Sequence, residues 1–288
     1  MTGIPDRTGP VPRVSVVVPT FQNAPFVEAT VESILAQTYP DYEILIGDHG
    51  STDGTWKRLQ RYADDPRITL WRTPAGGGAQ ANWRAVTAAA RGEFVKLVCG
   101  DDLLYPAALS EQVAAMDTHP GVSLVSARRD LIDATGRRLA GGFGPNRVQG
   151  RHEGEAAIRR TVRSGTNIFG EPAAVLLRRA DLVAVGGWWG DYPYAIDIAT
   201  YTLVLLRGDL VAIPHSLAAF RVSDSQWSVA LADDQAAQVI AFQQALADRE
   251  PGLLSGFDLR RGALAARMLA RGRRLAYRFL RRRMGLGR

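Results

Sequence analysis

The fold is decided by residues 14–55, VSVVVPTFQNAPFVEATVESILAQTYPDYEILIGDHGSTDGT. This segment alternates an apolar strand, a helical segment and a second apolar strand, at 13–20, 23–37 and 42–48. Asn23 is placed to cap the helix, and Pro25 falls in its first turn. Two strands separated by a helix indicate a parallel pair joined by a right-handed crossover.

The same alternation continues toward the middle of the chain. After a loop, it predicts a short helix, a strand, a helix and a strand, at 56–63, 67–71, 79–91 and 94–100. This order predicts an α/β protein with a doubly wound, mainly parallel sheet flanked by helices. Because such sheets bind ligands beyond the carboxyl ends of their strands, we expect Thr20, Asp48, Asp101 and Asp102 to converge on one crevice.

The second half of the chain is less regular. We expect a hairpin around Thr135-Gly136, a short helix closed by Gly186-Gly187, and several further helices and strands, at 106–118, 121–126, 171–179, 196–206, 210–214 and 217–222. The predicted organisation is an N-terminal extension (1–12), one α/β domain (13–250) and an arginine-rich amphipathic C-terminal helix or tail (251–288).

Composition excludes several classes of protein. The chain has 288 residues, of which 46% are hydrophobic and 22% charged, as in ordinary globular proteins. No apolar run approaches the roughly 18 residues of a membrane span, and the first 13 residues lack the apolar core of a secretory signal. We therefore expect a cytoplasmic protein, at most peripheral on the cytoplasmic face of the membrane. Cys99, the single cysteine, is predicted to be a core thiol, and four scattered histidines argue against a histidine-based zinc site.

Positive charge is concentrated at the C-terminus. Residues 259–288 contain 11 arginines and no acidic residue, so 24 of the 35 basic side chains remain in the rest of the chain, against 29 acidic ones. The body is therefore negative, and nucleic acid is not an expected partner. In the tail, Leu264, Met268, Leu275 and Phe279 form a strip beside arginines at helical spacing. Such a helix suits an anionic membrane surface; a nucleic acid, an acidic partner or a solvated tail remain alternatives.

Two adjacent aspartates follow the strand at 94–100. In KLVCGDDLLYP (96–106), Asp101 and Asp102 lie where neighbouring anions repel unless a positive charge sits beside them. Mg²⁺ and Mn²⁺ suit a site of one or two carboxylates completed by phosphate oxygens and water. The alternative is that the pair caps the helix that starts near Pro106.

These segments together resemble the family 2 glycosyltransferases of the GT-A fold. The likeness rests on residues 14–55, on GGGAQANWRAVTAAARGEFVKLVCGDDLLYP (76–106), on FGEPAAVLLRR and VGGW, and on Asp197; it covers roughly residues 13–225. The resemblance implies a GT-A-like fold and transfer of a sugar from a UDP-, GDP- or dTDP-linked donor to a saccharide or lipid-linked acceptor. It also implies a place in polysaccharide, glycolipid or glycoconjugate synthesis.

The resemblance further implies residue roles. Asp48 would accept a hydrogen bond from a base N–H, the main chain around Thr20 and Phe21 would line the base and ribose, and Asp101 would accept from ribose hydroxyls. The donor-binding residues predicted in this way are Pro19, Thr20, Phe21, Asn23, Asp48, Asn82 and Asp101. Asp102 would bind Mn²⁺ or Mg²⁺ that bridges the two phosphates.

Asp197 is the predicted general base, because inverting transfer needs a carboxylate to take the proton of the acceptor hydroxyl. The family usually has Glu-Asp here, whereas this chain has Ile196-Asp197. Asp191 is the second candidate, and a helix cap is the alternative role of Asp197. Near residue 223 the family often has a histidine that this chain lacks. Without a Q-x-x-R-W motif or membrane spans, transfer of one sugar is favoured over processive synthesis.

Several assignments stay open at this level. Asp48 and Asp53 also fit the roles of turn and cap residues, and Arg84 and Lys96 fit either diphosphate binding or a structural role. The aromatic residues before Asp197 fit an acceptor platform or the core: Trp188, Trp189, Tyr192 and Tyr194. Two rival functions are a sugar nucleotidyltransferase and an inactive nucleotide-sugar-binding protein.

Overall fold

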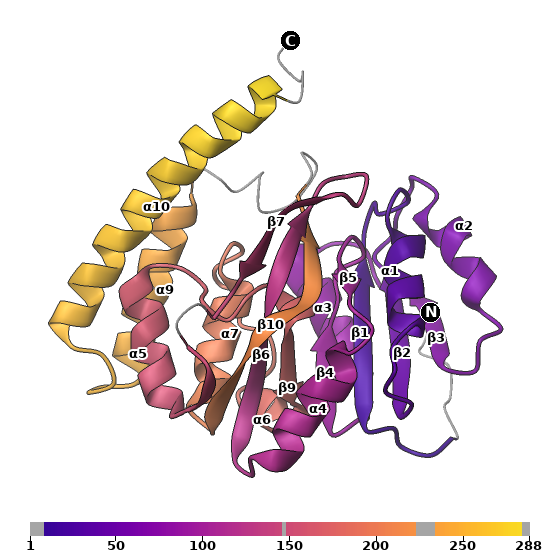
Figure 1. Cartoon of the computed structure of the whole chain (residues 1–288), viewed down its shortest axis with the longest axis horizontal. Helices are drawn as coiled ribbons and strands as arrows, with labels where there is room; N and C mark the ends of the chain where they lie inside the picture. Colours follow the sequence, from indigo (N-terminus) through magenta and orange to yellow (C-terminus); the bar gives the residue numbers. More distant parts are fainter. Residues whose placement is uncertain (1–8, 146–147, 223–233, 284–288) are drawn as a thin grey trace.

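The computed structural model describes residues 9–145, 148–222 and 234–283 (Figure 1). The N-terminal half contains the predicted alternation of strands and helices: β1 (Val14–Thr20), α1 (Val27–Leu35), β2 (Tyr42–Asp48), α2 (Thr55–Leu59), β3 (Ile68–Arg72), α3 (Gly78–Ala88) and β4 (Phe94–Leu97). β3, β2, β1 and β4 lie side by side in that order, and all their pairings are parallel. The register pairs Thr20 with Asp48, so the carboxyl ends of β1 and β2 coincide.

The second half extends the same sheet in mixed orientation. Its elements are β5 (Leu103–Leu104), α4 (Ala108–Thr118), β6 (Val122–Ile132), β7 (Arg138–Phe143), β8 (Gly150–His152), α5 (Gly154–Ser164), β9 (Val175–Arg178), α6 (Arg179–Ala184), α7 (Ile196–Leu205), β10 (Asp209–Arg221), α9 (Gln235–Arg249) and α10 (Gly256–Arg283). β9 is antiparallel to β4 and to β6, whereas β6 and β10 are parallel. β6 and β7 form the hairpin predicted around Thr135-Gly136.

Both faces of the sheet are covered by helices. Successive side chains of a strand point to opposite faces, so Val16 and Val18 pack with α1 and α4 in one apolar cluster. Val17 belongs to a second cluster, which contains residues of α3, α5, α7 and α9. The predicted doubly wound, mainly parallel sheet is thereby confirmed, with its polar strand ends left at one edge.

Several predicted boundaries were wrong; for example, the strand predicted at 94–100 ends at Leu97, and that predicted at 171–179 begins at Val175. Helix α1 begins at Val27 rather than at Asn23, and no side chain caps it. The Asn23 Oδ1 atom instead accepts a hydrogen bond from the Phe21 backbone N–H at 2.9 Å, within a turn where Gln22 adopts a positive φ of 55°. The strands predicted at 210–214 and 217–222 are one strand, β10, whose register shifts between Ile213 and Ala218.

The C-terminal helix α10 packs against α5 and α9 along its first half (Figure 1). Ser255 and Asp258 exchange hydrogen bonds at its start, which satisfies the Asp258 N–H of the first turn. The helices meet backbone to backbone, because a Cβ atom on Gly262 would lie 2.4 Å from the Val162 carbonyl oxygen. Part of the predicted tail therefore belongs to the packed fold. Among the described residues, no helix has the length and apolar character to cross a bilayer.

Lys96 is fully buried in β4, away from the polar strand ends. Its Nζ atom donates to Gln112 Oε1 at 2.7 Å and to the Val175 carbonyl at 3.3 Å. Burial lowers its pKa from 10.5 to about 7. Of the two roles left open for Lys96, the structural one is therefore correct.

We expect this lysine to make folding stability rise with pH. Between about pH 7 and 10.5 the unfolded state holds a proton that the folded state does not, so stability increases by about 2 kcal/mol from pH 7 to pH 9. Urea unfolding at both pH values should show this gain in the wild type and not in Lys96→Met. Lys57→Met, which changes the exposed second lysine of the chain, should retain it. An equal gain in all three proteins would contradict the assignment.

Candidate active site

A cavity of about 630 Å³ opens at the polar edge of the sheet, and it brings three predicted site residues together. Asp101 and Asp102 line it after β4, and Asp197 lines it from the first turn of α7. The described lining residues include four carboxylates and one arginine: Asp101, Asp102, Glu171, Asp197 and Arg129. The cavity is therefore rich in negative charge and suited to a ligand that carries a cation.

Asp102 is the most deeply buried of these carboxylates, with 1% of its surface exposed. Its Oδ1 atom accepts a hydrogen bond from the Arg221 backbone N–H at 3.1 Å. The Arg221 side chain donates to the Asp101 carbonyl at 2.8 Å, so the end of β10 fixes the position of the aspartate pair. Burial, followed by the charge of Asp101, raises the pKa of the Asp102 carboxyl well above its usual range.

The residues at this edge could hold a divalent cation only if phosphate oxygens and water complete its coordination. The described part of the chain contains no group of three or more His, Cys, Asp or Glu side chains that could hold a metal by themselves. A site of one or two carboxylates completed by phosphate oxygens and water is the usual arrangement for Mg²⁺. The buried Asp102 carboxylate fits that arrangement, since a cation beside it would offset its unfavourable burial.

Asp197 is held in a defined orientation. Its Oδ2 atom accepts from Asn167 Nδ2 at 2.8 Å, and its Oδ1 atom accepts from the Ile198 backbone N–H at 2.7 Å. Asn167 is itself fixed, because its Oδ1 atom accepts from the Phe169 backbone N–H at 2.8 Å. Burial raises the pKa of Asp197, while these two hydrogen bonds lower it in part. The helix N-cap is Ala195, so Asp197 is not the capping residue.

Sequence patterns did not predict that an arginine lines the cavity. Arg129, on β6, is almost fully buried, and burial lowers its pKa to about 10. Its guanidinium is paired with Glu171, 2.7 Å from Nη2 to Oε1, and it also lies within electrostatic range of Asp102 and Asp197. Glu171 lies in the FGEPAAVLLRR segment, and the family resemblance of this segment could have indicated a role for it in the site. Arg129 had no such signal, because only the course of β6 brings it to the cavity.

The predicted donor-binding residues adjoin this cavity. Thr20 and Asp48 end their strands side by side, and a Cβ atom on Gly100, next to Asp101, would lie 2.6 Å from Asn23 Oδ1 and 3.0 Å from Thr20 Cγ2. This close approach connects the ends of β1 and β2 to the aspartate pair. The four residues therefore lie at one edge of the sheet, but only Asp101 and Asp102 are among the described residues that line the cavity, so their convergence on one crevice stays a prediction.

Asp48 and Asp53 have different surroundings. Asp53 serves as a turn residue, because its carboxylate accepts from the Ala24 and Thr55 backbone N–H groups at 2.9 and 3.0 Å; the N-cap of α2 is Gly54. Asp48 is fully buried, and its Oδ2 atom accepts from the Ser51 N–H at 3.3 Å. Its Oδ1 atom has no hydrogen-bond partner among the described residues. A buried acceptor of this kind suits a donor supplied by a ligand.

The other predicted donor residues occupy supporting positions. Asn82 donates to the Thr20 carbonyl at 3.2 Å and accepts from Thr73 Oγ1 at 3.2 Å, so its amide holds the strand ends together. Phe21 is 55% exposed and packs edge-on to His49. Pro19 is buried in β1, paired in register with Gly47.

For nearby residues, the structure decides two assignments that the sequence left open and corrects one expectation. Trp188 is a core residue rather than part of an acceptor platform: its Nε1 atom donates to Thr87 Oγ1 at 2.8 Å, and its carbonyl accepts from Arg84. Arg84 is thus structural. Cys99, expected in the core, is only partly buried: it packs against the core cluster and also lines the cavity.

The other three aromatic residues have different surroundings. Asp191, the second base candidate, does not line the cavity. Tyr194 lines the cavity, whereas Trp189 and Tyr192 pack edge-on against Phe242. Asp191 accepts from Trp189 Nε1 at 2.9 Å and is not among the described lining residues.

Residues 15–182 match the family model described as Glycosyl transferase family 2. The chain belongs to this family. It is therefore a glycosyltransferase, as the sequence motifs predicted. The described aspartates at the ends of β2 and β4 fall inside the matched range, and Asp197 lies beyond it.

Relatives and solved structures agree with the family 2 assignment. The putative glycosyltransferase EpsE of Bacillus subtilis is 30% identical over 131 residues, which are 45% of this chain and 47% of EpsE. S. aureus TarS, solved with UDP-GlcNAc, aligns with a TM-score of 0.66 at 17% identity over 82% of this chain and 67% of TarS. The mannosyltransferase PcManGT from Pyrobaculum calidifontis, solved with GDP-Man and Mn²⁺, aligns with a TM-score of 0.62 at 22% identity over 96% and 84%. At these identities the structures establish the GT-A-like fold, and the chain spans under half of EpsE.

The buried charge of Asp102 should lower the stability of the ligand-free protein. Asp102→Asn removes the charge and keeps an oxygen that can accept from the Arg221 N–H. We expect the variant to melt a few degrees higher, because about 1 kcal/mol shifts Tm by about 2–4 °C in a domain of comparable size. The exposed control Asp191→Asn should melt within about a degree of the wild type. A lower Tm for Asp102→Asn in calorimetry would refute this account of the site.

Proposed function

We propose that this family 2 enzyme moves a single sugar from a nucleotide-diphosphate sugar to an acceptor hydroxyl, with inversion at the anomeric carbon and with Mn²⁺ or Mg²⁺ bound at Asp102. The observation that carries the proposal is the shared cavity of Asp101, Asp102 and Asp197 beside the ends of β1 and β2. This arrangement supports a cation and diphosphate site next to a carboxylate that can accept a proton.

The donor nucleotide lies along the ends of β1 and β2 in this proposal. The Asp48 Oδ1 atom, which has no partner in the described structure, accepts from a base N–H. Phe21 is exposed enough to contact the base or ribose, and Asp101 accepts from ribose hydroxyls. The complexes of TarS with UDP-GlcNAc and of PcManGT with GDP-Man support a UDP-, GDP- or dTDP-linked donor.

Asp102, with Asp101 beside it, would hold the cation. When bound, a divalent cation would neutralise charge on the leaving diphosphate. The excess of carboxylates in the cavity supports this assignment, as does the Mn²⁺ in the PcManGT complex. Arg221 supports it indirectly, since its backbone N–H and side chain hold the aspartate pair in place.

Asp197 takes the proton from the acceptor hydroxyl. A raised pKa suits a general base, because proton transfer is most effective when the pKa lies closer to the working pH. Asn167 directs the carboxylate through its 2.8 Å hydrogen bond. Buried Ile196 stands where the family usually has glutamate, and Ser223 and Asp224 lie outside the described residues.

The acceptor is proposed to be a saccharide or a lipid-linked saccharide, in polysaccharide, glycolipid or glycoconjugate synthesis. α10 presents exposed apolar side chains and arginines to its surroundings. This supports peripheral association with an anionic membrane on the cytoplasmic side, and no nucleic-acid partner is proposed. Donor hydrolysis assayed with and without Mn²⁺ separates an active transferase from an inactive nucleotide-sugar-binding protein.

The metal assignment predicts that nucleotide-diphosphate binding depends on Mn²⁺ through Asp102. Calorimetry should show that Mn²⁺ strengthens binding of the cognate nucleotide diphosphate to the wild type by at least about tenfold. Asp102→Asn should lose that enhancement, because the amide is a poorer ligand for a hard cation. The enhancement should persist in Asp191→Asn. If Mn²⁺ strengthens binding equally in Asp102→Asn, the assignment is wrong.

The base assignment predicts a loss of rate without a loss of donor affinity. Asp197→Asn removes the proton acceptor and keeps most of the geometry, so kcat should fall about 10²–10⁴-fold. The donor Kd should change less than about twofold, since Asp48 and Asp102 still hold the donor. Asp191→Asn serves as the control and should keep near wild-type kcat. A wild-type rate in Asp197→Asn would exclude it as the base, and a collapse of donor affinity would place it in the nucleotide site.

A further inference from the structure

A second cavity, of about 600 Å³, lies between α5 and α10 and has a strongly basic lining. Three arginines and a histidine contribute to it: Arg160, Arg163, Arg261 and His152. Ser164 adds a hydroxyl, and Ile168 belongs to the apolar part of the wall. None of the described residues that line this cavity is acidic, in contrast to the negative lining of the catalytic cavity.

Helix packing explains why the arginines converge. Arg160, Arg163 and Ser164 are spaced by three and four residues along α5, so they lie on one face of that helix. Arg261 comes from α10, which contacts α5 closely: a Cβ atom on Gly165 would lie 2.3 Å from the Ala266 backbone nitrogen. This close contact holds the two helices together, so the arginines of α5 and α10 line the same cavity.

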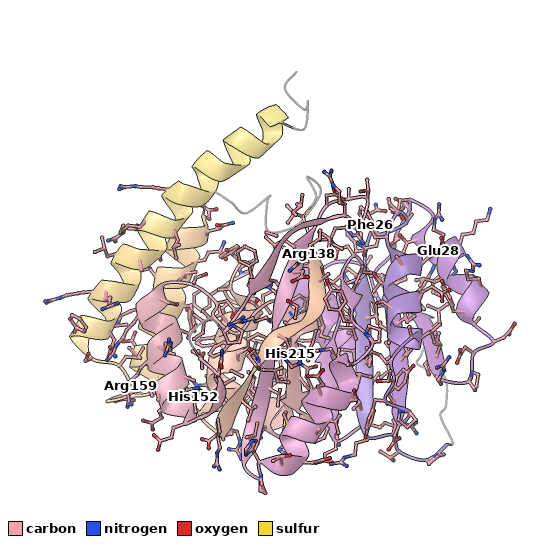
Figure 2. The ribbon with its side chains drawn as sticks, in the orientation of Figure 1. Phe26, Glu28, Arg138, His152, Arg159 and His215 are labelled. Atoms are coloured by element: carbon pink, nitrogen blue, oxygen red, sulfur yellow. The ribbon has the colours of Figure 1, made fainter. Side chains whose placement is uncertain are left out.

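The position of the Arg163 side chain is fixed by a residue that does not line the cavity. It forms an ion pair with Asp258, which is almost fully buried and also accepts from Ser255 Oγ at 2.7 Å. The guanidinium is thereby oriented before any ligand arrives. Figure 2 labels His152 and Arg159 at the same end of the molecule. Arginine guanidinium groups bind phosphate oxygens with paired hydrogen bonds, and fixed orientation favours such binding.

Exposed apolar side chains lie on the face of α10 that carries Arg261. Phe257, Leu264 and Met268 are 64%, 60% and 63% exposed, and their spacing of four, three and four residues through Arg261 places all four on one strip. Large exposed apolar side chains mark interaction surfaces. A soluble phosphate makes no contact with such side chains, whereas a bilayer accommodates apolar side chains beneath its phosphate groups.

We propose that the basic cavity between α5 and α10 binds the phosphate of an anionic lipid headgroup, while Phe257, Leu264 and Met268 enter the adjoining bilayer surface. The inference adds a specific site to the membrane association proposed above. It assigns recognition to residues of the folded domain, rather than to the general charge of the C-terminal arginines. A volume of about 600 Å³ accommodates a headgroup phosphate with its attached glycerol.

The site adjoins the catalytic cavity through one loop and one helix. Ser164 and Ile168 line the basic cavity, whereas Thr166 and Asn167, between them in sequence, line the catalytic one. α10 supplies Arg261 to the first cavity and Leu269 to the second. A lipid bound in the basic cavity therefore brings the catalytic cavity to the membrane, where a lipid-linked acceptor is presented.

Vesicle binding tests the site directly. Full-length protein is sedimented with phosphatidylcholine vesicles that contain or lack phosphatidylglycerol, at about 0.15 M salt. The cavity variant is Arg160→Gln/Arg261→Gln, and the matched control is Arg267→Gln/Arg271→Gln, which removes the same charge from exposed positions of α10 outside the cavity. General attraction predicts about a fivefold loss per arginine in both pairs. The proposal predicts at least about tenfold more loss in the cavity variant.

A soluble phosphate and an apolar variant distinguish the sources of phosphate. Glycerol 3-phosphate should compete with wild-type vesicle binding at constant ionic strength and leave the residual binding of the cavity variant unchanged. Leu264→Ser/Met268→Ser should weaken vesicle binding at least about tenfold without changing competition by glycerol 3-phosphate. Unchanged Tm and donor affinity in all variants would show that the fold and the catalytic site are intact.

Two results would overturn the inference. Equal losses in the cavity and control pairs would leave only general attraction by the tail. Binding of glycerol 3-phosphate through the cavity arginines, without any recruitment to phosphatidylglycerol vesicles, would identify a soluble phosphate as the ligand. Both results leave the glycosyltransferase proposal intact, because neither measurement involves sugar transfer.

Discussion

Burial of negative charge at one edge of the sheet is the constraint on which this structure depends. Asp102 is buried and Asp197 is partly buried in a cavity where one arginine faces four carboxylates. Burial raises the pKa of both, so the ligand-free protein holds charge in a place where it is unfavourable. A cation with a diphosphate would relieve that cost at Asp102, and a raised pKa is useful for proton transfer at Asp197. The arrangement that lowers stability is therefore the one that supports the proposed chemistry.

The surrounding fold keeps these carboxylates in place with neutral and backbone groups. The Arg221 backbone N–H bonds to Asp102, and the Asn167 amide bonds to Asp197. Asn82 joins the end of β1 to the loop after β3 by the same kind of contact. Hydrogen bonds from uncharged groups fix geometry without neutralising the site. The cavity consequently keeps its negative potential for a cation.

The C-terminal helix connects this catalytic edge to the proposed membrane-binding face by packing against the domain. Close contacts at Gly165 and Gly262 hold α10 against α5, and Asp258 anchors its first turn to Arg163. One face of α10 thus packs against the domain, and the opposite face has exposed apolar side chains. Because Leu269 of this helix reaches the catalytic cavity, the proposed membrane docking and the proposed acceptor entry would involve the same element.

The sequence by itself determined the family, the doubly wound sheet and the positions of Asp48, Asp101, Asp102 and Asp197 at element ends. These features follow from local periodicity and short motifs, which depend on neighbours along the chain. Only the tertiary structure decided which polar residues reach the cavity. Lys96 and Arg84 resemble phosphate-binding residues in sequence, yet packing buries one and joins the other to the Trp188 carbonyl. Arg129, Glu171 and Asn167 enter the site because β6, the loop after α5 and the start of α7 meet there, and such contacts between distant segments leave no periodic trace in the sequence.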